Sequence, residues 1–117
     1  MQGYTYTKGE HYPMEHLVFK VAPEDVERYL EGDHEIWTLK EAFAPGFDHI
    51  PFLYKEVWIN DNKPGEIHFI FAWESIESWR KIDQKEYQAQ LIKEFDEKFG
   101  RPYELIRVVQ NEENFGV

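Results

Sequence analysis

The chain lacks cysteine and has no long apolar run, and each absence removes a class of protein. With no cysteine among 117 residues, it has no disulfide framework, no thiolate metal site and no cysteine nucleophile. This composition suits a reducing compartment, and we expect a cytoplasmic protein. No apolar run reaches the roughly 18 residues needed to cross a bilayer, and the first residues do not resemble a signal peptide. We therefore predict a soluble protein.

Basic residues are scarce as well. The chain carries 13 lysines and arginines against 23 aspartates and glutamates, which gives a formal net charge of −10. The negative electrostatic field of this charge repels a phosphate backbone and an anionic membrane surface. We therefore predict that neither nucleic acid nor a membrane is a partner. The acidity also serves solubility, because many of these side chains fall on helix faces that solvent covers.

Sequence motifs for cofactors and metals are missing. The chain has no glycine-rich nucleotide loop, no G-x-S-x-G and no zinc signature. Its histidines show neither H-x-H nor H-x-x-x-H spacing: His11, His16, His34, His49 and His68. We therefore expect no metal site and no cofactor.

Aromatic residues are abundant, at 17% of the chain, which is more than a small core requires and predicts an interface or a ligand pocket. The segment Glu66–Glu74 (EIHFIFAWE) reads as a strand that is apolar on both faces. With a period of two, one face carries Ile67, Phe69, Phe71 and Trp73, and the other carries Ile70 and Ala72. The predicted helices cover one face, and too little chain remains to cover the other, so we predict a homodimer.

The remaining elements follow from periodicity and from breaker residues. We predict strands at Met14–Val21, Leu53–Ile59, Glu66–Glu74 and Tyr103–Gln110, and helices at Pro23–Ala44 and Ser75–Phe99. We expect an amino-terminal arm over residues 1–13, one domain over 14–110 and a loose tail over 111–117. The turn-rich residues 60–65 predict a hairpin between the second and third strands.

The order β-α-β-β-α-β is typical of the ferredoxin-like α+β fold, with a four-stranded antiparallel sheet and two helices on one face. The uncovered face of the sheet can pack against the same face of a second copy across a two-fold axis. We therefore predict a dimeric α+β barrel.

Several short motifs carry a family resemblance. They are D-x-E-I-W-T at residues 33–38, P-G-F at 45–47, K-E-V-W-I-N at 55–60, Trp73 with Ser75, and Trp79 with Ile82. On these motifs the chain resembles the dimeric α+β barrel superfamily that contains antibiotic biosynthesis monooxygenases, haem-degrading monooxygenases and related isomerases. Within it, the chain is similar to a small family that is associated with cyanobacteria and has no established activity. The resemblance spans residues 15–109, and residues 48–54 depart from it as a longer loop.

The resemblance implies some activities and argues against others. Haem-degrading relatives share an Asn on the first strand and a Trp and a His on the second helix. Here the first strand offers Glu15 and His16, and the second helix has Trp79 but no His. Haem degradation is therefore not supported, whereas cofactor-independent quinol oxidation, which has no strict signature in the superfamily, remains open.

Asp33 is the main candidate for chemistry. Helical spacing puts Val26, Leu30, Asp33 and Trp37 on one stripe, so a carboxyl occupies a core position. Burial would raise its pKa and make it a general base, whereas a nearby donor would keep it ionised and structural. His34 follows it, either gating the same cavity or lying on the helix surface. We predict Asp33 and His34 as catalytic residues.

Three further residues are candidates for substrate binding. Trp37 and Trp79 lie on the core-facing sides of their helices, where they either wall a cavity or fill the core. His68 alternates away from its apolar neighbours, so it either lines the site or is a buried, hydrogen-bonded histidine. We predict that Trp37, His68 and Trp79 contact the substrate.

Two functions remain open at this point. One is a small-molecule-binding homodimer that acts as a cofactor-independent monooxygenase or isomerase on a hydrophobic or aromatic substrate. The alternative is a non-catalytic dimeric binding or structural module. A cavity that touches Asp33 favours the enzyme, and a filled layer between helices and sheet favours the module.

Overall fold

The computed structural model describes residues 11–116, and the side chains of residues 12–109. The strands are β1 (His11–Val21), β2 (Phe52–Ile59), β3 (Glu66–Trp73) and β4 (Tyr103–Gly116). The α-helices are α1 (Val26–Gly32), α2 (Leu39–Ala42), α3 (Ile76–Ile82) and α4 (Lys85–Phe99).

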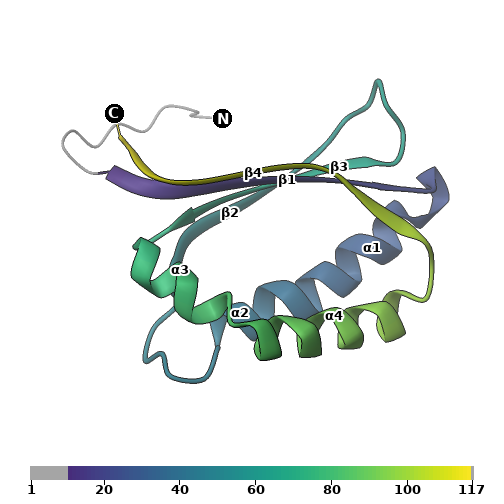
Figure 1. Cartoon of the computed structure of the whole chain (residues 1–117). Helices are drawn as coiled ribbons and strands as arrows, with labels where there is room; N and C mark the ends of the chain where they lie inside the picture. Colours follow the sequence, from purple (N-terminus) through teal and green to yellow (C-terminus); the bar gives the residue numbers. More distant parts are fainter. Residues whose placement is uncertain (1–10, 117) are drawn as a thin grey trace.

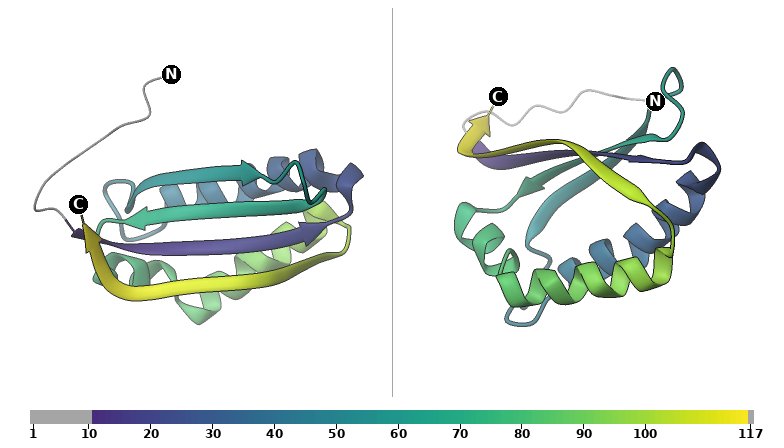
Figure 2. Two further views of the ribbon diagram at one scale, coloured as in Figure 1. Left: turned by 90° about the horizontal axis from the view of Figure 1, so that it is seen from above. Right: turned by 45° about the vertical axis from the view of Figure 1, so that its right-hand side comes forward.

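The strands form one antiparallel sheet in the order β2-β3-β1-β4, and the helices cover one face of it (Figures 1 and 2). This confirms the predicted ferredoxin-like α+β fold. The predicted hairpin is also present, since β2 and β3 pair antiparallel from Phe52–Trp73 to Ile59–Ile67.

The first predicted helix is not one regular helix. It opens with a 3₁₀ turn over Pro23–Asp25, continues as α1, widens into a π-helical turn over Asp33–Thr38 and ends as α2. The π turn coincides with the D-x-E-I-W-T motif, and such turns are frequent at functional sites. Just before it, Gly32 packs so closely on α4 that a Cβ there would lie 3.1 Å from the Phe95 ring.

The second predicted helix is broken in two. The Ser75 hydroxyl caps α3 by accepting a 3.0 Å hydrogen bond from the Ser78 amide. The helix then stops at Asp83, Gln84 is extended, and α4 begins at Lys85. The break turns the chain between α3 and α4, and it places Asp83 beside the space between helices and sheet.

The ends of the chain differ from the predicted boundaries. The backbone of β4 continues to Gly116 and pairs with β1 as far as His11, so strand replaces most of the predicted tail. Residues 11–13 of the predicted arm belong to β1. The other arm residues and Val117 lie outside the described residues.

The core lies between the sheet and the helices and is mainly aromatic. All four residues predicted on one face of β3 are buried there: Ile67, Phe69, Phe71 and Trp73. Tyr29 of α1 makes T-shaped contacts with Phe95 and Phe99 of α4, with ring centroids 4.9 and 5.2 Å apart. Such edge-to-face pairs stabilise the layer beyond the apolar area that they bury.

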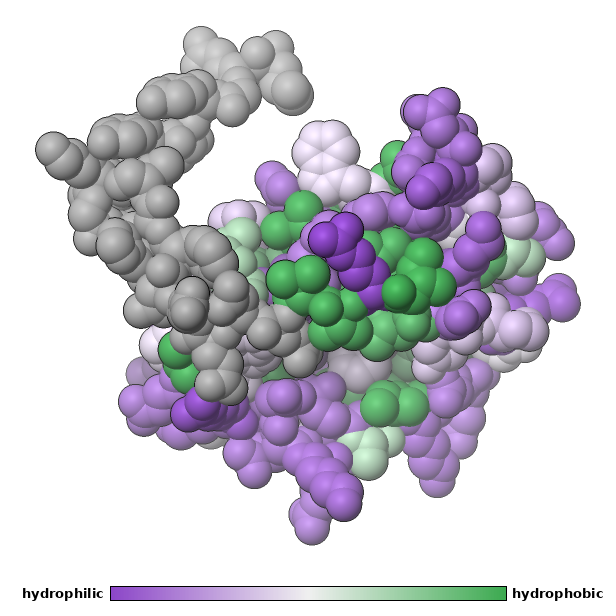
Figure 3. Space-filling view, turned by 45° about the horizontal axis from the view of Figure 1, so that its top comes forward, coloured by the Kyte–Doolittle hydropathy of each residue, from purple (hydrophilic) through white to green (hydrophobic). Residues whose placement is uncertain are grey.

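The opposite face of the sheet is not covered by any helix, and Figure 3 shows apolar side chains gathered on it. Exposed members include Tyr54 and Trp58 of β2 and Val109 of β4. A polar pair interrupts this outer face, where His16 Nε2 lies 2.9 Å from His68 Nδ1. His68 Nε2 lies in turn 2.7 Å from a Glu66 carboxylate oxygen.

Gly65, at the end of the β2–β3 turn, is expected to tolerate no side chain. Its φ is +92°, and a Cβ would lie 2.2 Å from the Val21 carbonyl oxygen, which is a steric clash with the backbone. We expect Gly65→Ala to lower the free energy of unfolding by about 3 kcal/mol or more, measured by urea denaturation. Gly46→Ala is the matched control, because Gly46 has φ +90° but open space around it; it should cost only about 1 kcal/mol. Equal effects would show that the close approach at Gly65 is unimportant.

Candidate functional site

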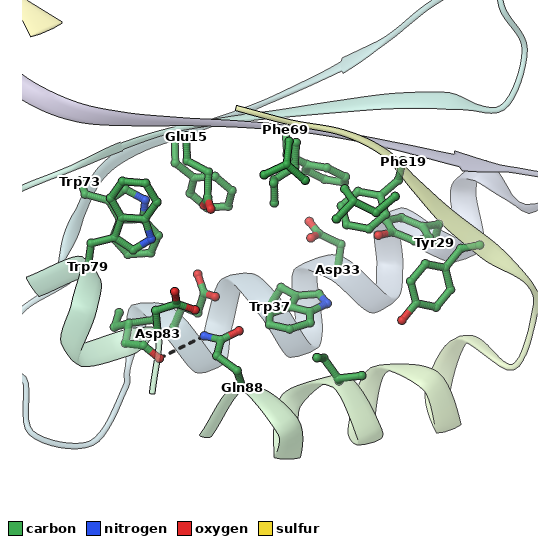
Figure 4. Close-up of a pocket in the computed structure, with 18 residues that line it drawn as sticks. Glu15, Phe19, Tyr29, Asp33, Trp37, Phe69, Trp73, Trp79, Asp83 and Gln88 are labelled. Atoms are coloured by element: carbon green, nitrogen blue, oxygen red, sulfur yellow. Dashed lines mark hydrogen bonds between the residues drawn. The ribbon is translucent and has the colours of Figure 1, made fainter. Parts of the chain in front are cut away.

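A cavity of about 420 Å³ lies between the sheet and the helices. Figure 4 shows it bounded by β1 and β3 on the sheet side and by the first helical segment and α4 on the other. Its walls are mainly apolar, with eight aromatic side chains, and four carboxyl groups line it: Glu15, Asp33, Glu41 and Asp83. The layer between helices and sheet is therefore hollow at this place.

The π turn and α2 supply one wall of the cavity. Asp33, Trp37 and Glu41 recur every four residues and all line it. Residues spaced by four lie on the same face of a helix. Two carboxyl groups and an indole therefore face the same cavity.

Asp33 forms a buried ion pair with Lys55 of β2. Lys55 Nζ donates to Asp33 Oδ2 at 2.6 Å and to Thr38 Oγ1 at 2.7 Å. The ammonium also lies 5.1 and 5.2 Å from the ring centroids of Phe69 and Phe71, which favours a cation there. Burial raises the pKa of Asp33 above its usual value, and the charge and hydrogen bond of Lys55 oppose that rise. We take the pair as ionised, because the contact is direct and the rings stabilise the ammonium.

Glu41 is a further buried carboxyl group of the cavity, at 7% exposure, as is Glu15. The pKa of Glu41 is raised to about 8, mainly by burial; the Lys55 charge opposes this rise, and the negative charges of Glu15, Asp33 and Asp83 add to it. Near neutral pH, Glu41 is therefore mostly protonated while Asp33 is ionised. Two carboxyl groups whose pKa values are driven apart can serve as an acid and a base in one site.

The raised pKa of Glu41 makes stability depend on pH. Between its ordinary pKa of 4.5 and about 8, the folded protein keeps a proton that the unfolded chain has lost. This contribution to stability is full below pH 4.5 and is lost as the pH rises through 8. We expect Glu41→Gln to raise the free energy of unfolding relative to the native protein at pH 8.5, by about 2 kcal/mol or more, and to have little effect at pH 4.5. Urea denaturation at both pH values measures this, and a pH-independent difference would contradict it.

Stacked indoles close one end of the cavity (Figure 4). The rings of Trp73 and Trp79 lie 5.9 Å apart at an angle of 6°, and Trp73 also stacks on Phe71 at 5.5 Å. Trp73 Nε1 is buried and has no hydrogen-bond partner within the described part of the chain. A buried donor without a partner is costly, so this N–H can bind an acceptor atom that enters the cavity.

The structure brings together three of the five predicted site residues. Asp33, Trp37 and Trp79 all line the cavity. His34 is exposed on the helix surface and does not line it. His68 lies on the outer face of the sheet, hydrogen-bonded to His16, because it alternates with the inward-facing Ile67 and Phe69. Of the two alternatives for each histidine, the structure thus supports a surface position for His34 and a hydrogen-bonded position away from the cavity for His68.

Sequence reasoning missed Lys55 and Glu41. A signal for Lys55 was present, since it shares a face of β2 with Val57 and Ile59, where a lysine is out of place. Glu41 follows Trp37 by four residues, which extends the stripe that contains Asp33. Neither signal predicts which residue Lys55 or Glu41 contacts, because the contact between β2 and the π turn forms only in the folded chain.

The described residues provide neither a ready metal site nor a helix that could cross a membrane. Among the described residues, no three His, Asp or Glu side chains are arranged to hold a metal ion. Within the same residues, no helix is long and apolar enough to span a bilayer.

Comparisons with known proteins find likeness in structure only. No model of a protein family matches the chain, and no curated protein matches it in sequence. The crystal structure of a protein from Caulobacter crescentus CB15, provisionally named an antibiotic biosynthesis monooxygenase, is similar with a TM-score of 0.54 and 12% identity. The similarity covers 87% of this chain and 92% of that one.

Two further crystal structures are similar. One is a conserved protein from Methanosarcina mazei Go1, with a TM-score of 0.51 and 14% identity over 85% of this chain and 92% of that one. The other, from an uncultured marine organism, is described as a dimeric ferredoxin-like protein, with a TM-score of 0.50 and 16% identity over 86% and 84%. These likenesses establish the fold. At such low identity they do not fix a function.

Proposed function

We propose that this protein is a small-molecule-binding homodimer of the antibiotic biosynthesis monooxygenase-like superfamily. In this proposal it acts without a cofactor on a hydrophobic or aromatic substrate, as a monooxygenase or an isomerase. The observation that carries the proposal is the aromatic cavity that holds an ionised Asp33 and a protonated Glu41. The alternative of a non-catalytic module loses support, because a structural layer has no need of a hollow lined by carboxyl groups.

The chemistry that both activities share is removal of a proton from carbon. Asp33 accepts the proton from a carbon next to a carbonyl or an aromatic ring, and Glu41 donates a hydrogen bond or a proton to the oxygen that gains charge. Return of the proton to another carbon gives isomerisation. In the oxygenase version the carbanion of a CH₂ group reduces O₂, the carbon becomes a carbonyl, and the second oxygen atom leaves as water.

Assembly as a homodimer is supported by the apolar outer face of the sheet. Trp58 is 58% exposed there, in a face that also contains Tyr54 and Val109. Monomeric proteins rarely expose a contiguous apolar patch of this kind. The marine protein with the same fold is described as a dimeric ferredoxin-like protein, which supports a dimer here.

Proton exchange at carbon tests the proposal. We expect the protein to speed exchange of C–H for C–D in D₂O for members of a panel of aryl ketones, measured by NMR, or to consume O₂ with polycyclic aryl ketones that carry a CH₂ group. Asp33→Asn should lower the rate by about 100-fold or more, as expected for loss of a general base. Glu77→Gln, an exposed carboxyl group on α3, is the matched control and should keep the full rate. No exchange and no O₂ uptake across both panels would favour the non-catalytic module.

A further inference from the structure

The charges around the cavity are unbalanced. Four carboxyl groups line it, and no lysine or arginine within the described residues does so. Lys55 reaches only its edge, where its ammonium is already paired with Asp33. An anionic ligand would therefore enter a field of its own sign and would have to lose its hydration as well.

One polar group in the cavity wall is buried without a hydrogen-bond partner among the described residues, and a buried carboxyl group lies in the same wall. The carboxyl group is that of Glu41, which is only 7% exposed. Trp73 Nε1 is buried without an acceptor, and Figure 4 shows the indole beside the interior of the cavity. Buried polar groups are nearly always satisfied, so unpaired ones that face a hollow indicate where a ligand binds.

The Lys55 ammonium at the edge of the cavity shows which groups bind an ammonium ion here. It combines a carboxylate, Asp33, with two aromatic faces, Phe69 and Phe71. The cavity wall offers groups of the same two kinds: carboxyl groups of Glu41 and Asp83, and aromatic rings of Trp37 and Trp79. Recognition of organic ammonium ions by rings and carboxylates is a general solution in proteins.

We propose that the ligand of this cavity is a hydrophobic amine bound as its ammonium ion, with the ammonium at Glu41 and Asp83 and its apolar body against the tryptophans. This inference rests on the part of the proposed function that places a hydrophobic ligand in this cavity with Asp33 as the base; for an amine, Glu41 binds the positive charge instead of donating a proton. Acceptor atoms on the apolar body would satisfy Trp73 Nε1. Glu41 ionises when the ammonium binds, since a positive charge beside a carboxyl group favours its charged form.

The test compares three molecules of similar shape by isothermal titration calorimetry at pH 7: tryptamine, tryptophol and indoleacetate. They carry an ammonium, a neutral hydroxyl and a carboxylate on the same ring. We expect tryptamine to bind about tenfold or more tightly than tryptophol, the gain typical of a charge-assisted hydrogen bond, and indoleacetate to bind weakest. Binding of tryptophol or indoleacetate as tight as that of tryptamine would overturn the inference.

Variants assign the effect to Glu41. Glu41→Gln should lower tryptamine affinity about tenfold and leave tryptophol affinity unchanged, while the control Glu77→Gln changes neither. A loss of affinity for both molecules, or for neither, would contradict the assignment. The comparison of the three molecules on the native protein stands even if Glu41→Gln folds poorly.

Proton release is an independent readout. Tryptamine should release up to one proton per site at pH 7, seen as a dependence of the heat on the buffer, and should bind more tightly as the pH rises through about 8, the pKa of Glu41. Tryptophol should release none. The charged or titratable groups that act on Glu41 come from every element around it: Glu15, Asp33, Lys55, Asp83 and Tyr87.

The outcomes separate this inference from the proposed function. If tryptophol binds the cavity and tryptamine does not, the cavity is a ligand site and the inference about charge is wrong. If none of the three binds, the inference is also wrong, and the exchange of C–H for C–D decides the proposed function alone.

Discussion

Asp33→Asn is expected to lower the free energy of unfolding by about 3–5 kcal/mol, because it leaves the buried Lys55 ammonium without its counter-charge. The side chains of Lys55 and Asp33 are only 7% and 10% exposed, so water cannot replace the lost partner. Urea denaturation at pH 7 measures the effect. A change of less than about 1 kcal/mol would show that the pair is not an ionised, buried one.

A second substitution separates the charge effect from any effect of shape. In the double variant Asp33→Asn with Lys55→Met, no uncompensated charge remains, and we expect most of the lost stability to return. Glu35→Gln is the control, because it breaks an exposed ion pair with Lys98. The Glu35 side chain is 54% exposed and the Lys98 side chain 39%. That change should cost less than about 1 kcal/mol. Turnover should be absent in both variants of Asp33, since stability is restored but the base is not.

Ile70→Asp and Phe69→Asp are expected to have opposite consequences, although the two residues are adjacent in β3. Phe69 is 2% exposed and lies under the helices, so a carboxyl group there should prevent folding, at a cost of about 4 kcal/mol or more. Ile70 faces the outer side of the sheet, where it is only half-buried. A carboxyl group there should leave the fold intact and separate the proposed dimer into monomers.

Size-exclusion chromatography with light scattering, together with circular dichroism, distinguishes these outcomes. Glu77→Gln, on an exposed position of α3 and away from the outer face of the sheet, is a control that should change neither fold nor assembly. A folded dimer of Ile70→Asp would show that the outer face of the sheet is not the interface. A folded Phe69→Asp would contradict the assignment of the two faces of β3.

Much of the fold follows from the sequence alone. The period of two in Glu66–Glu74 assigns Phe69 and Phe71 to one face and Ile70 to the other, because successive side chains in a strand alternate. The turn residues before Gly65 join β2 to β3, and the order of elements then leaves few topologies. Both predictions are local or nearly so, and the structure agrees with them.

The irregular parts of the helices could not be predicted in the same way. The π turn at Asp33–Thr38 has the composition of an ordinary helix, and in the folded chain it contacts α4 and bonds to Lys55 of β2. The break at Asp83 likewise lies within a continuous helical pattern. Tertiary packing decides such details, since the local preferences involved are small.

The features of the candidate site likewise fall into those that the sequence predicts and those that depend on tertiary packing. The sequence alone determined that Asp33 and Trp37 share a stripe, that a carboxyl group occupies a core position, and that β3 is apolar on both faces. Only the tertiary structure decided that Lys55 meets Asp33, that Glu41 joins them, that the layer is hollow, and that His68 faces away from it. The physical reason is that periodicity fixes which side of an element a residue occupies, whereas an ion pair or a cavity depends on how distant elements pack against one another.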